Sequence, residues 1–149
     1  MKRIVLLSIL PQWADAILDG KKKWEYRRVP PKVEEGSKVL LYASGNRHEI
    51  VGEFVIDKIL HEPLGLLIKR TLHETTHTDD DLYAYFKGLK IGSALKVKYP
   101  KRYDNPVSLK QIQNKVASFT PPQNFRYLEE DDPTLKQIFE LLPMMASID

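Results

Sequence analysis

Residues 20–28 hold the densest group of side chains that could bind an anion or move a proton. Five of these nine residues are cations, and two aromatic residues and one glutamate are interleaved with them. Lysine and arginine hold phosphate groups and aromatic rings stack on bases, so this composition is typical of a site for a ligand that carries both. The alternative is a solvated basic edge strand, because lysine on an edge opposes edge-to-edge pairing of sheets.

Glu25 is the acid of this block, and its neighbours decide what it can do. Alternate residues of a strand share a face, so the strand should carry two sets of side chains: Lys23, Glu25 and Arg27 on one face, and Trp24, Tyr26 and Arg28 on the other. An ion-pair network of Glu25 with Lys23 and Arg27 would orient the cations. The carboxylate could also accept a proton or a ligand's amino group.

The run His73-Glu74-Thr75-Thr76-His77 matches H-E-x-x-H, which on a helix places two histidines on one face as zinc ligands beside a glutamate base. Two β-branched threonines lie inside the match, and Thr78 is a good N-cap for a following helix. The run should therefore straddle a helix end and a turn. A catalytic zinc also needs a third protein ligand, and nothing marks His48 or His61 as one. We therefore expect a surface turn, with no metal and no cofactor.

The segment Phe119–Leu128 is the third candidate. Its two prolines, Pro121 and Pro122, fix an extended backbone, which reduces the entropy that neighbouring side chains lose on binding a ligand. Its aromatic residues should pack inward and its polar residues should face outward: Phe125 and Tyr127, against Gln123, Asn124 and Arg126. No P-loop, Rossmann glycine fingerprint or Gly-x-Ser-x-Gly turn is present.

Length and composition limit the remaining possibilities. The chain has 149 residues, a formal net charge of +3 and no cysteine. We expect a single domain over residues 1–149, large enough to bury a core without disulfides. The absence of cysteine excludes a disulfide scaffold, a thiolate nucleophile and thiolate metal sites, so lysine is the candidate reactive group. The small positive charge permits an anionic partner without requiring one.

The apolar run Ile4–Ile9 is too short to span a membrane. It is followed at once by Pro11, Gln12 and Trp13, which favours a buried first strand over the apolar part of a signal peptide. We therefore expect a cytoplasmic protein with no membrane partner.

The apolar pattern predicts about five or six strands and four or five short helices without regular β-α alternation. This favours an α+β fold built on a small β-barrel over a doubly wound parallel sheet. Strands are predicted at 4–9, 23–29, 38–44, 49–60 and 93–98, with 119–128 as an extended loop or strand. Helices are predicted at 11–20, around 64–72, and at 78–88, 108–115 and 134–142. Gly52 should mark a bulge where its strand bends.

Several of these segments, in their order along the chain, resemble the ASCH domain family, a PUA-like β-barrel group. Gly20, Lys22, Glu25 and Arg27 match the family's G-x-K-x-x-E-x-R signature. The other matching segments are Leu7–Pro11, Lys38–Ser44, Val51–Phe54, Phe86–Gly88, Ala94–Val97 and Pro121–Leu128. The resemblance covers the chain from about residue 4 to residue 128.

The resemblance implies a small PUA-like barrel surrounded by short helices, with a cationic cleft beside the first helix. Lys22 would point into the cleft, with Glu25 and Arg27 nearby. It also implies RNA or nucleotide binding, with a role in transcription or translation. The ligand-binding residues that we expect are Lys22, Glu25, Arg27, Arg28, Ser44, Gln123 and Arg126.

One branch of the family hydrolyses the amide of N4-acetylcytidine. That branch pairs the signature lysine with a threonine three residues on, where this chain has Glu25, and it uses a later glutamate in the region of Glu74. Relatives often have lysine at the position of Leu10. Because the threonine is absent, we favour a binding module that is not an enzyme. The alternative is a small amidohydrolase or ribonuclease acting on modified nucleosides or RNA, with Lys22 as nucleophile or base and Glu25 moving the proton. A protein-interaction domain is a further alternative, and the oligomeric state stays undetermined.

Overall fold

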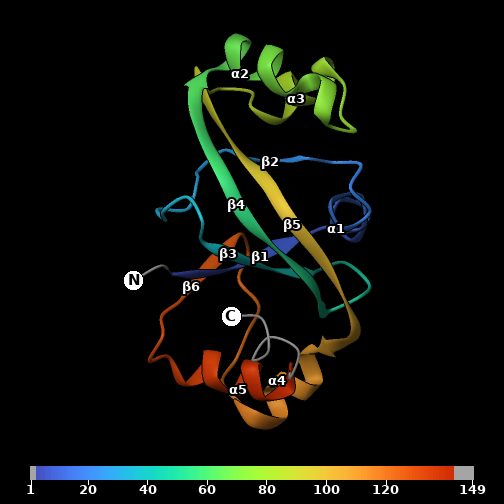
Figure 1. The fold of residues 1–149 in the computed structure, drawn as a ribbon, viewed down its shortest axis with the longest axis vertical. Helices are drawn as coiled ribbons and strands as arrows, with labels where there is room; N and C mark the ends of the chain where they lie inside the picture. Colours follow the sequence, from blue (N-terminus) through green and yellow to red (C-terminus); the bar gives the residue numbers. More distant parts are fainter. Residues whose placement is uncertain (1–2, 143–149) are drawn as a thin grey trace.

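Two long antiparallel strands run through the molecule from end to end. They are β4 (Glu49–Pro63) and β5 (Ile91–Ser108) (Figure 1). The structure is a computed structural model and describes residues 3–142. The model has six strands in one mixed sheet, in the order β2-β5-β4-β3-β1-β6. No ladder joins the two outer strands among residues 3–142, so the sheet is open in its hydrogen bonding rather than a closed barrel.

The centre of the sheet is made of short apolar strands. β1 (Ile4–Ile9) pairs in parallel with β3 (Lys38–Ala43), and both are buried along most of their length. β6 (Phe125–Leu128) pairs antiparallel with β1 at one edge, and β2 (Trp24–Arg27) pairs antiparallel with β5 at the other. Strands covered on both faces read as continuous apolar runs, which is why these central strands were predictable from sequence.

Helices cover the faces and both ends of this sheet. α2 (Leu64–Thr71), a short 3-10 turn (Leu72–Glu74) and α3 (Asp79–Tyr85) connect β4 to β5 at one end of the molecule. At the other end lie α4 (Leu109–Lys115) and α5 (Pro133–Leu141), and α1 (Pro11–Leu18) lies beside β5 (Figure 1). The predicted N-cap Thr78 is confirmed at the start of α3, and Ser108 caps α4 at the start of the helix predicted at 108–115; each forms a full capping box.

The period of two along β1 divides the core. Leu6 packs with Leu40 and Ile138 toward α4 and α5, whereas Val5 and Leu7 pack on the opposite face toward α1. A third cluster holds α2 and α3 against β2, with Trp24, Phe86 and Leu67 at its centre. α1 therefore packs on one face of the sheet, and residues of α1, β2 and α3 line a common pocket.

The predicted α+β class is confirmed, and most elements lie where the pattern placed them. The prediction for β5 was too short, because only residues 93–98 alternate cleanly and the strand continues to Ser108 through two prolines and a run of polar residues. Gly52 lies at a register shift between β4 and β5, as predicted, and a Cβ there would meet the Lys101 carbonyl at 2.5 Å. None of the helices over residues 3–142 has the length and apolar character needed to cross a membrane.

Candidate functional site

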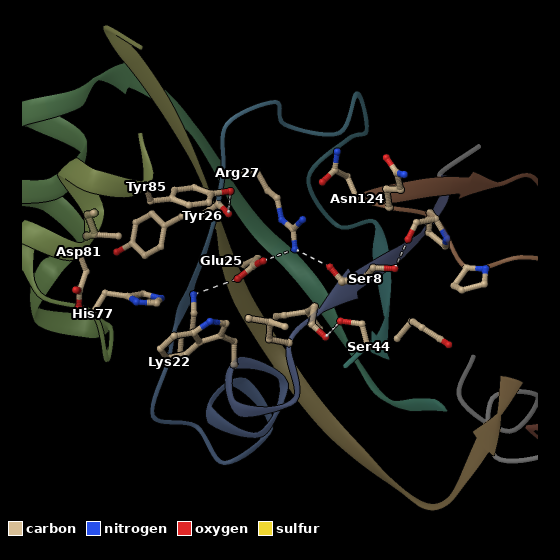
Figure 2. Close-up of a pocket in the computed structure, with 18 of the residues that line it drawn as sticks. Ser8, Lys22, Glu25, Tyr26, Arg27, Ser44, His77, Asp81, Tyr85 and Asn124 are labelled. Carbon is tan, nitrogen blue, oxygen red and sulfur yellow. Dashed lines mark hydrogen bonds and ion pairs between the residues drawn. The ribbon is translucent and has the colours of Figure 1, made fainter. Parts of the chain in front are cut away.

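A pocket of about 840 Å³ opens between α1, β2 and α3 on one side and residues 121–124 on the other (Figure 2). This volume is within the range of small-molecule sites in proteins. Five of the seven predicted ligand-binding residues line it: Lys22, Glu25, Arg27, Ser44 and Gln123. The topology therefore brings the signature block together with the end of β3 and with the proline-containing segment.

Lys22 enters this pocket because of how α1 ends. Gly20 has a φ of +78° and terminates the helix in the left-handed conformation, and the amides of Lys21 and Lys22 then return to the Ala16 carbonyl. This turn directs the Lys22 side chain inward, where it is 1% exposed, while Lys21 and Lys23 are exposed on either side of it.

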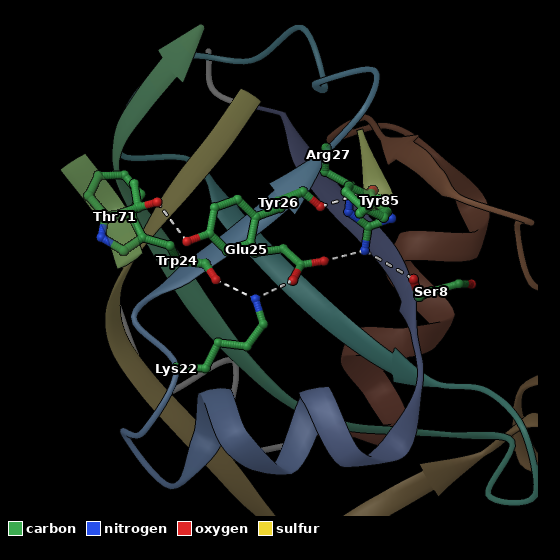
Figure 3. A network of polar contacts seen from close by, with 8 residues as sticks. All are labelled: Ser8, Lys22, Trp24, Glu25, Tyr26, Arg27, Thr71 and Tyr85. Atoms are coloured by element: carbon green, nitrogen blue, oxygen red, sulfur yellow. Dashed lines mark hydrogen bonds and ion pairs between the residues drawn. The ribbon is translucent and has the colours of Figure 1, made fainter. Parts of the chain in front are cut away.

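Glu25 is held between two cations at the floor of the pocket (Figure 3). The Lys22 ammonium donates to the backbone carbonyl of Trp24 and to Oε1 of Glu25, at 3.1 Å in the second case. Arg27 donates through Nη2 to Oε2 of Glu25 at 2.5 Å and to the Ser8 carbonyl at 3.2 Å. The predicted ion pair of Glu25 with Arg27 is thus present, but its second partner is Lys22, and the prediction of a pair with Lys23 was wrong because Lys23 faces solvent. The burial of Trp24, Glu25 and Tyr26 also excludes a merely solvated edge strand.

Burial and charge act in opposite directions on this group. Burial raises the pKa of Glu25, but the charges and hydrogen bonds of Lys22 and Arg27 outweigh it and hold the pKa below its ordinary value. Burial lowers the pKa of Lys22; the Glu25 carboxylate opposes this and the Arg27 charge adds to it. Lys22, Glu25 and Arg27 therefore form a coupled network that carries one net positive charge.

Aromatic rings form the wall that faces this network from α1, β2 and α3. The His77 ring lies 4.4 Å from the Trp13 ring and 5.8 Å, edge to face, from the Tyr26 ring. Tyr26 donates to Thr71 at 2.7 Å, and Tyr85 donates to the Tyr26 carbonyl at 3.2 Å. Both bonds fix the tyrosine rings, so this wall is formed before any ligand arrives.

His77 and Asp81 add titratable groups to the aromatic wall. His77 precedes the Thr78 N-cap of α3, and the Asp81 carboxylate accepts from the Thr78 amide at 3.1 Å. Burial lowers the pKa of His77, as does the nearby Lys22 charge, while Glu25 and Asp81 act in the opposite direction. The imidazole is therefore held as a neutral ring that can donate or accept a hydrogen bond.

The facing wall carries polar groups on a fixed backbone. Ser8 uses all three of its polar groups: its amide donates to the Asn124 carbonyl at 2.9 Å, its hydroxyl donates to the Pro122 carbonyl at 2.6 Å, and its carbonyl accepts from Arg27. These bonds tie residues 122–124 to β1. Asn124 and Ser44 lie across the pocket from His77 and Tyr85, with Lys22, Glu25 and Arg27 between the two walls (Figure 2). The Gln123 and Asn124 side chains are exposed and line the opening.

Two predicted ligand-binding residues lie outside the pocket lining. Arg28 donates to the carbonyls of Tyr85 and Lys87 at 2.8 and 3.0 Å and so ties β2 to the end of α3. Arg126 is paired with Asp132 at 3.3 Å, beside the N-cap of α5.

The H-E-x-x-H match does not form a zinc-binding helix. His73 and Glu74 end a 3-10 turn and the chain then bends before His77, so the motif straddles a helix end and a turn, as predicted. Glu74 instead accepts from the Trp24 indole at 3.1 Å. Within residues 3–142 no three His, Asp or Glu side chains are grouped to hold a metal ion.

Sequence reasoning missed most of the aromatic wall. Trp13 and Tyr85 lie within the helices predicted at 11–20 and 78–88, and His77 within the predicted surface turn, yet all three line the pocket. Tyr26 was included only as part of the basic and aromatic block. The sequence did contain a signal, because aromatic residues occur on the two helices that lie before and after the cationic strand. Only the three-dimensional packing shows that these residues form one wall.

Comparison with known proteins defines the class. The ASCH domain model matches residues 7–113, so the chain belongs to the ASCH domain family. A curated protein of Zymomonas mobilis subsp. mobilis named ASCH domain-containing ribonuclease is 26% identical over 133 residues, covering 88% of each chain.

The fold agrees with solved structures of other proteins. The structure of ASCH from Zymomonas mobilis has a TM-score of 0.84 at 24% identity and covers 93% of this chain and 94% of that one. The N-terminal domain of McrB from Staphylothermus marinus is more distant, with a TM-score of 0.57 at 12% identity over 92% of this chain and 93% of that one. These likenesses show the shared fold.

Proposed function

We propose that this protein binds RNA through the pocket, which holds one unpaired nucleotide with its base between the two walls. The observation that carries the proposal is the pairing of a preformed aromatic wall, Trp13, Tyr26, Tyr85 and His77, with a facing wall of amides and hydroxyls. Stacking on rings and hydrogen bonds to base edges are how proteins recognise unpaired bases in RNA. Membership of the ASCH family and the name of the Zymomonas relative support RNA as the ligand class.

The charge of the lining indicates which part of the nucleotide occupies the floor. The lining holds two fixed cations, Lys22 and Arg27, and two carboxylates, Glu25 and Asp81. The Asp81 carboxylate balances the net positive charge of the Lys22, Glu25 and Arg27 network, so the lining as a whole offers no surplus positive charge to a phosphate. The base therefore enters the pocket, and the phosphates stay outside near exposed cations such as Lys21 and Lys23.

The test is binding of the four ribonucleoside monophosphates and of single-stranded RNA of about ten nucleotides, a length within the range of known single-strand sites. Trp13→Ala should weaken binding of both by roughly tenfold, because stacking of one base is lost. Trp13→Phe keeps a ring and should retain most of the affinity. Absence of RNA binding at low salt would sink the proposal, and so would equal binding by Trp13→Ala and the wild type.

Catalysis is the second candidate, and the ribonuclease name of the Zymomonas relative favours it. In this case Lys22, Glu25 and His77 are among the groups in the pocket able to move protons, and the pKa of Lys22 is lowered by its burial. Incubation with labelled RNA and with N4-acetylcytidine tests this candidate for either hydrolysis. Lys22→Met should abolish turnover, whereas Lys21→Met, which changes an exposed neighbour, should not.

A further inference from the structure

Tyr99 occupies a bulge in β5 that packing does not explain. Val55 pairs with Lys98 and Glu53 pairs with Lys101, so Tyr99 and Pro100 together stand opposite Phe54 alone. Tyr99 has a φ of 51° and is 71% exposed. A bulky side chain rarely adopts positive φ, because its Cβ approaches the following carbonyl, and here little burial of the ring offsets that strain. Backbone strain that the fold does not use points to a role for the exposed ring.

The Tyr99 ring lies beside a cation. The Lys98 ammonium is 4.9 Å from the ring centroid. The Val97 amide donates to the Lys23 carbonyl at 2.9 Å. A Cβ added at Gly52 would meet both the Lys101 carbonyl and the Leu18 side chain, so Lys101 lies close to the end of α1. The turn from α1 into β2 therefore runs beside the bulge, and the side chains of Lys21 and Lys23 in this turn are exposed.

The acids near these lysines also contact other cations: Glu74, which interacts with Lys23, is 3.7 Å from Lys96. Lys98 is 4.0 Å from Asp57, at the limit of an ion pair, and Asp19 is already bound to Arg102 at 2.7 Å. Tyr83 provides the contrast, since this tyrosine is also exposed but follows three consecutive aspartates in α3. An exposed ring alone therefore does not distinguish Tyr99 from Tyr83. The distinguishing feature of Tyr99 is the lysine beside its ring.

We propose that Tyr99, with Lys98, Lys21 and Lys23, is a second RNA contact, where the ring stacks on one base of a single strand and the ammonium groups hold its phosphates. Sequence-tolerant binding of single strands uses this combination of stacking and backbone charge. The proposal rests on RNA being the ligand of the pocket and extends the bound strand beyond one nucleotide. Lys22 lines the pocket, whereas Lys21 and Lys23 are exposed outside its lining, so one strand could meet the turn on its way from the pocket to Tyr99.

Tyr99→Gly tests the proposal with two readouts that should move in opposite directions. Glycine tolerates positive φ, so the variant should melt at a temperature equal to or higher than the wild type. Its affinity for single-stranded RNA of about ten nucleotides should nevertheless fall roughly tenfold, since one stacked base is lost. Tyr99→Phe should bind like the wild type, and Tyr83→Ala, the control for an exposed tyrosine elsewhere, should also leave RNA affinity unchanged.

The lysines are tested by salt dependence. Lys98→Gln should reduce the slope of log affinity against log salt by about 0.7, the value for release of one counterion from single-stranded nucleic acid. Wild-type affinity of Tyr99→Gly for RNA would overturn the proposal. So would a lower melting temperature for this variant, because the ring would then support the fold.

Failure of this proposal is distinguishable from failure of the pocket. Binding of a ribonucleoside monophosphate should depend on Trp13 and be unaffected by Tyr99→Gly. Loss of nucleotide binding in Trp13→Ala, together with unchanged RNA binding by Tyr99→Gly, would overturn the second contact alone. RNA binding that depends on Tyr99 but not on Trp13 would overturn the pocket assignment and leave the second contact as an independent site.

Discussion

Glu25 and its two cationic partners are the residues on which the pocket floor depends. Three charged groups are buried together: Glu25 accepts from both cations, and each cation also donates to a backbone carbonyl, while the buried Nε of Arg27 has no hydrogen-bond partner. A buried ion pair adds little to stability compared with apolar residues of the same shape, but removing one partner leaves an uncompensated charge. The network therefore fixes the geometry of the site more than it strengthens the fold.

Glu25→Gln should destabilise the protein by about 3–5 kcal/mol at neutral pH, because Lys22 and Arg27 would remain buried without their carboxylate. Chemical denaturation measures the change. Glu34→Gln, at an exposed glutamate, is the matched control and should change stability by less than about 0.5 kcal/mol. A small effect of Glu25→Gln would show that the cations find other partners.

The difference between wild type and Glu25→Gln should shrink as the solution is acidified. The pKa of Glu25 is lower in the folded protein than the ordinary value of 4.5, so the unfolded chain binds the proton more readily. The stability that the carboxylate contributes is present above pH 4.5 and is lost as the pH falls through the folded-state pKa. Denaturation midpoints of both proteins across this range check the sign, and a constant difference would contradict it.

At the scale of elements, the position of α1 is set by its contact with β4 and β5. A side chain at Gly52 would collide with the Lys101 carbonyl at 2.5 Å and with the Leu18 side chain at 2.8 Å. Arg102 fixes the same helix by binding Asp15 and Asp19 at 2.9 and 2.7 Å. α1 carries Trp13 and leads into Lys22, so the geometry of the pocket depends on this contact.

Gly52→Ala and Gly65→Ala should change stability in opposite directions. At Gly52 the added methyl group must displace backbone or Leu18, at a cost of about 1–3 kcal/mol. At Gly65, inside α2, the nearest atom is the Tyr83 hydroxyl at 3.7 Å, and alanine should stabilise the helix by about 0.5–1 kcal/mol. Thermal or chemical denaturation compares the two; a neutral Gly52→Ala would mean that α1 can shift without cost.

Local signals explain why much of this fold was predictable. The strand 4–9, the helix after Pro11 and the capping boxes at Thr78 and Ser108 depend on nearby residues, and each lies where the sequence placed it. The extension of β5 depends on pairing with β4. This pairing holds the segment extended although its two prolines and many polar residues do not predict a strand.

The site was predictable only in part, for the same reason. Lys22, Glu25 and Arg27 are close in sequence, so the resemblance to the family signature placed them together. Their partners in the pocket are distant: Ser8 and Asn124 meet through pairing of β1 and β6, and His77 arrives through the packing of α3. No periodicity along the chain encodes those meetings.

At the scale of the whole molecule, the two walls of the pocket come from segments associated with opposite edges of the sheet. α3 hangs from the far end of β4 and β5, whereas residues 121–124 precede β6 at the other edge of the sheet (Figure 1). The Arg27 bond to the Ser8 carbonyl is one connection between these walls, and a ligand in the pocket would add another.

Ligand binding should therefore protect both walls together. Hydrogen exchange with and without single-stranded RNA of about ten nucleotides should show slower exchange in residues 76–86 and in residues 121–126 at the same RNA concentration. α5, which lies away from the pocket, is the internal control. Protection of one wall without the other would place the ligand outside the pocket.

The two tryptophans give the protein an optical reporter of its own state. Trp24 is buried and bonded to Glu74, so its emission should change only when the fold opens. Trp13 lies against His77 at the pocket, where a bound base or a protonated imidazole would quench its emission. Fluorescence of Trp24→Phe therefore isolates the pocket, and that of Trp13→Phe isolates the core, without any added label.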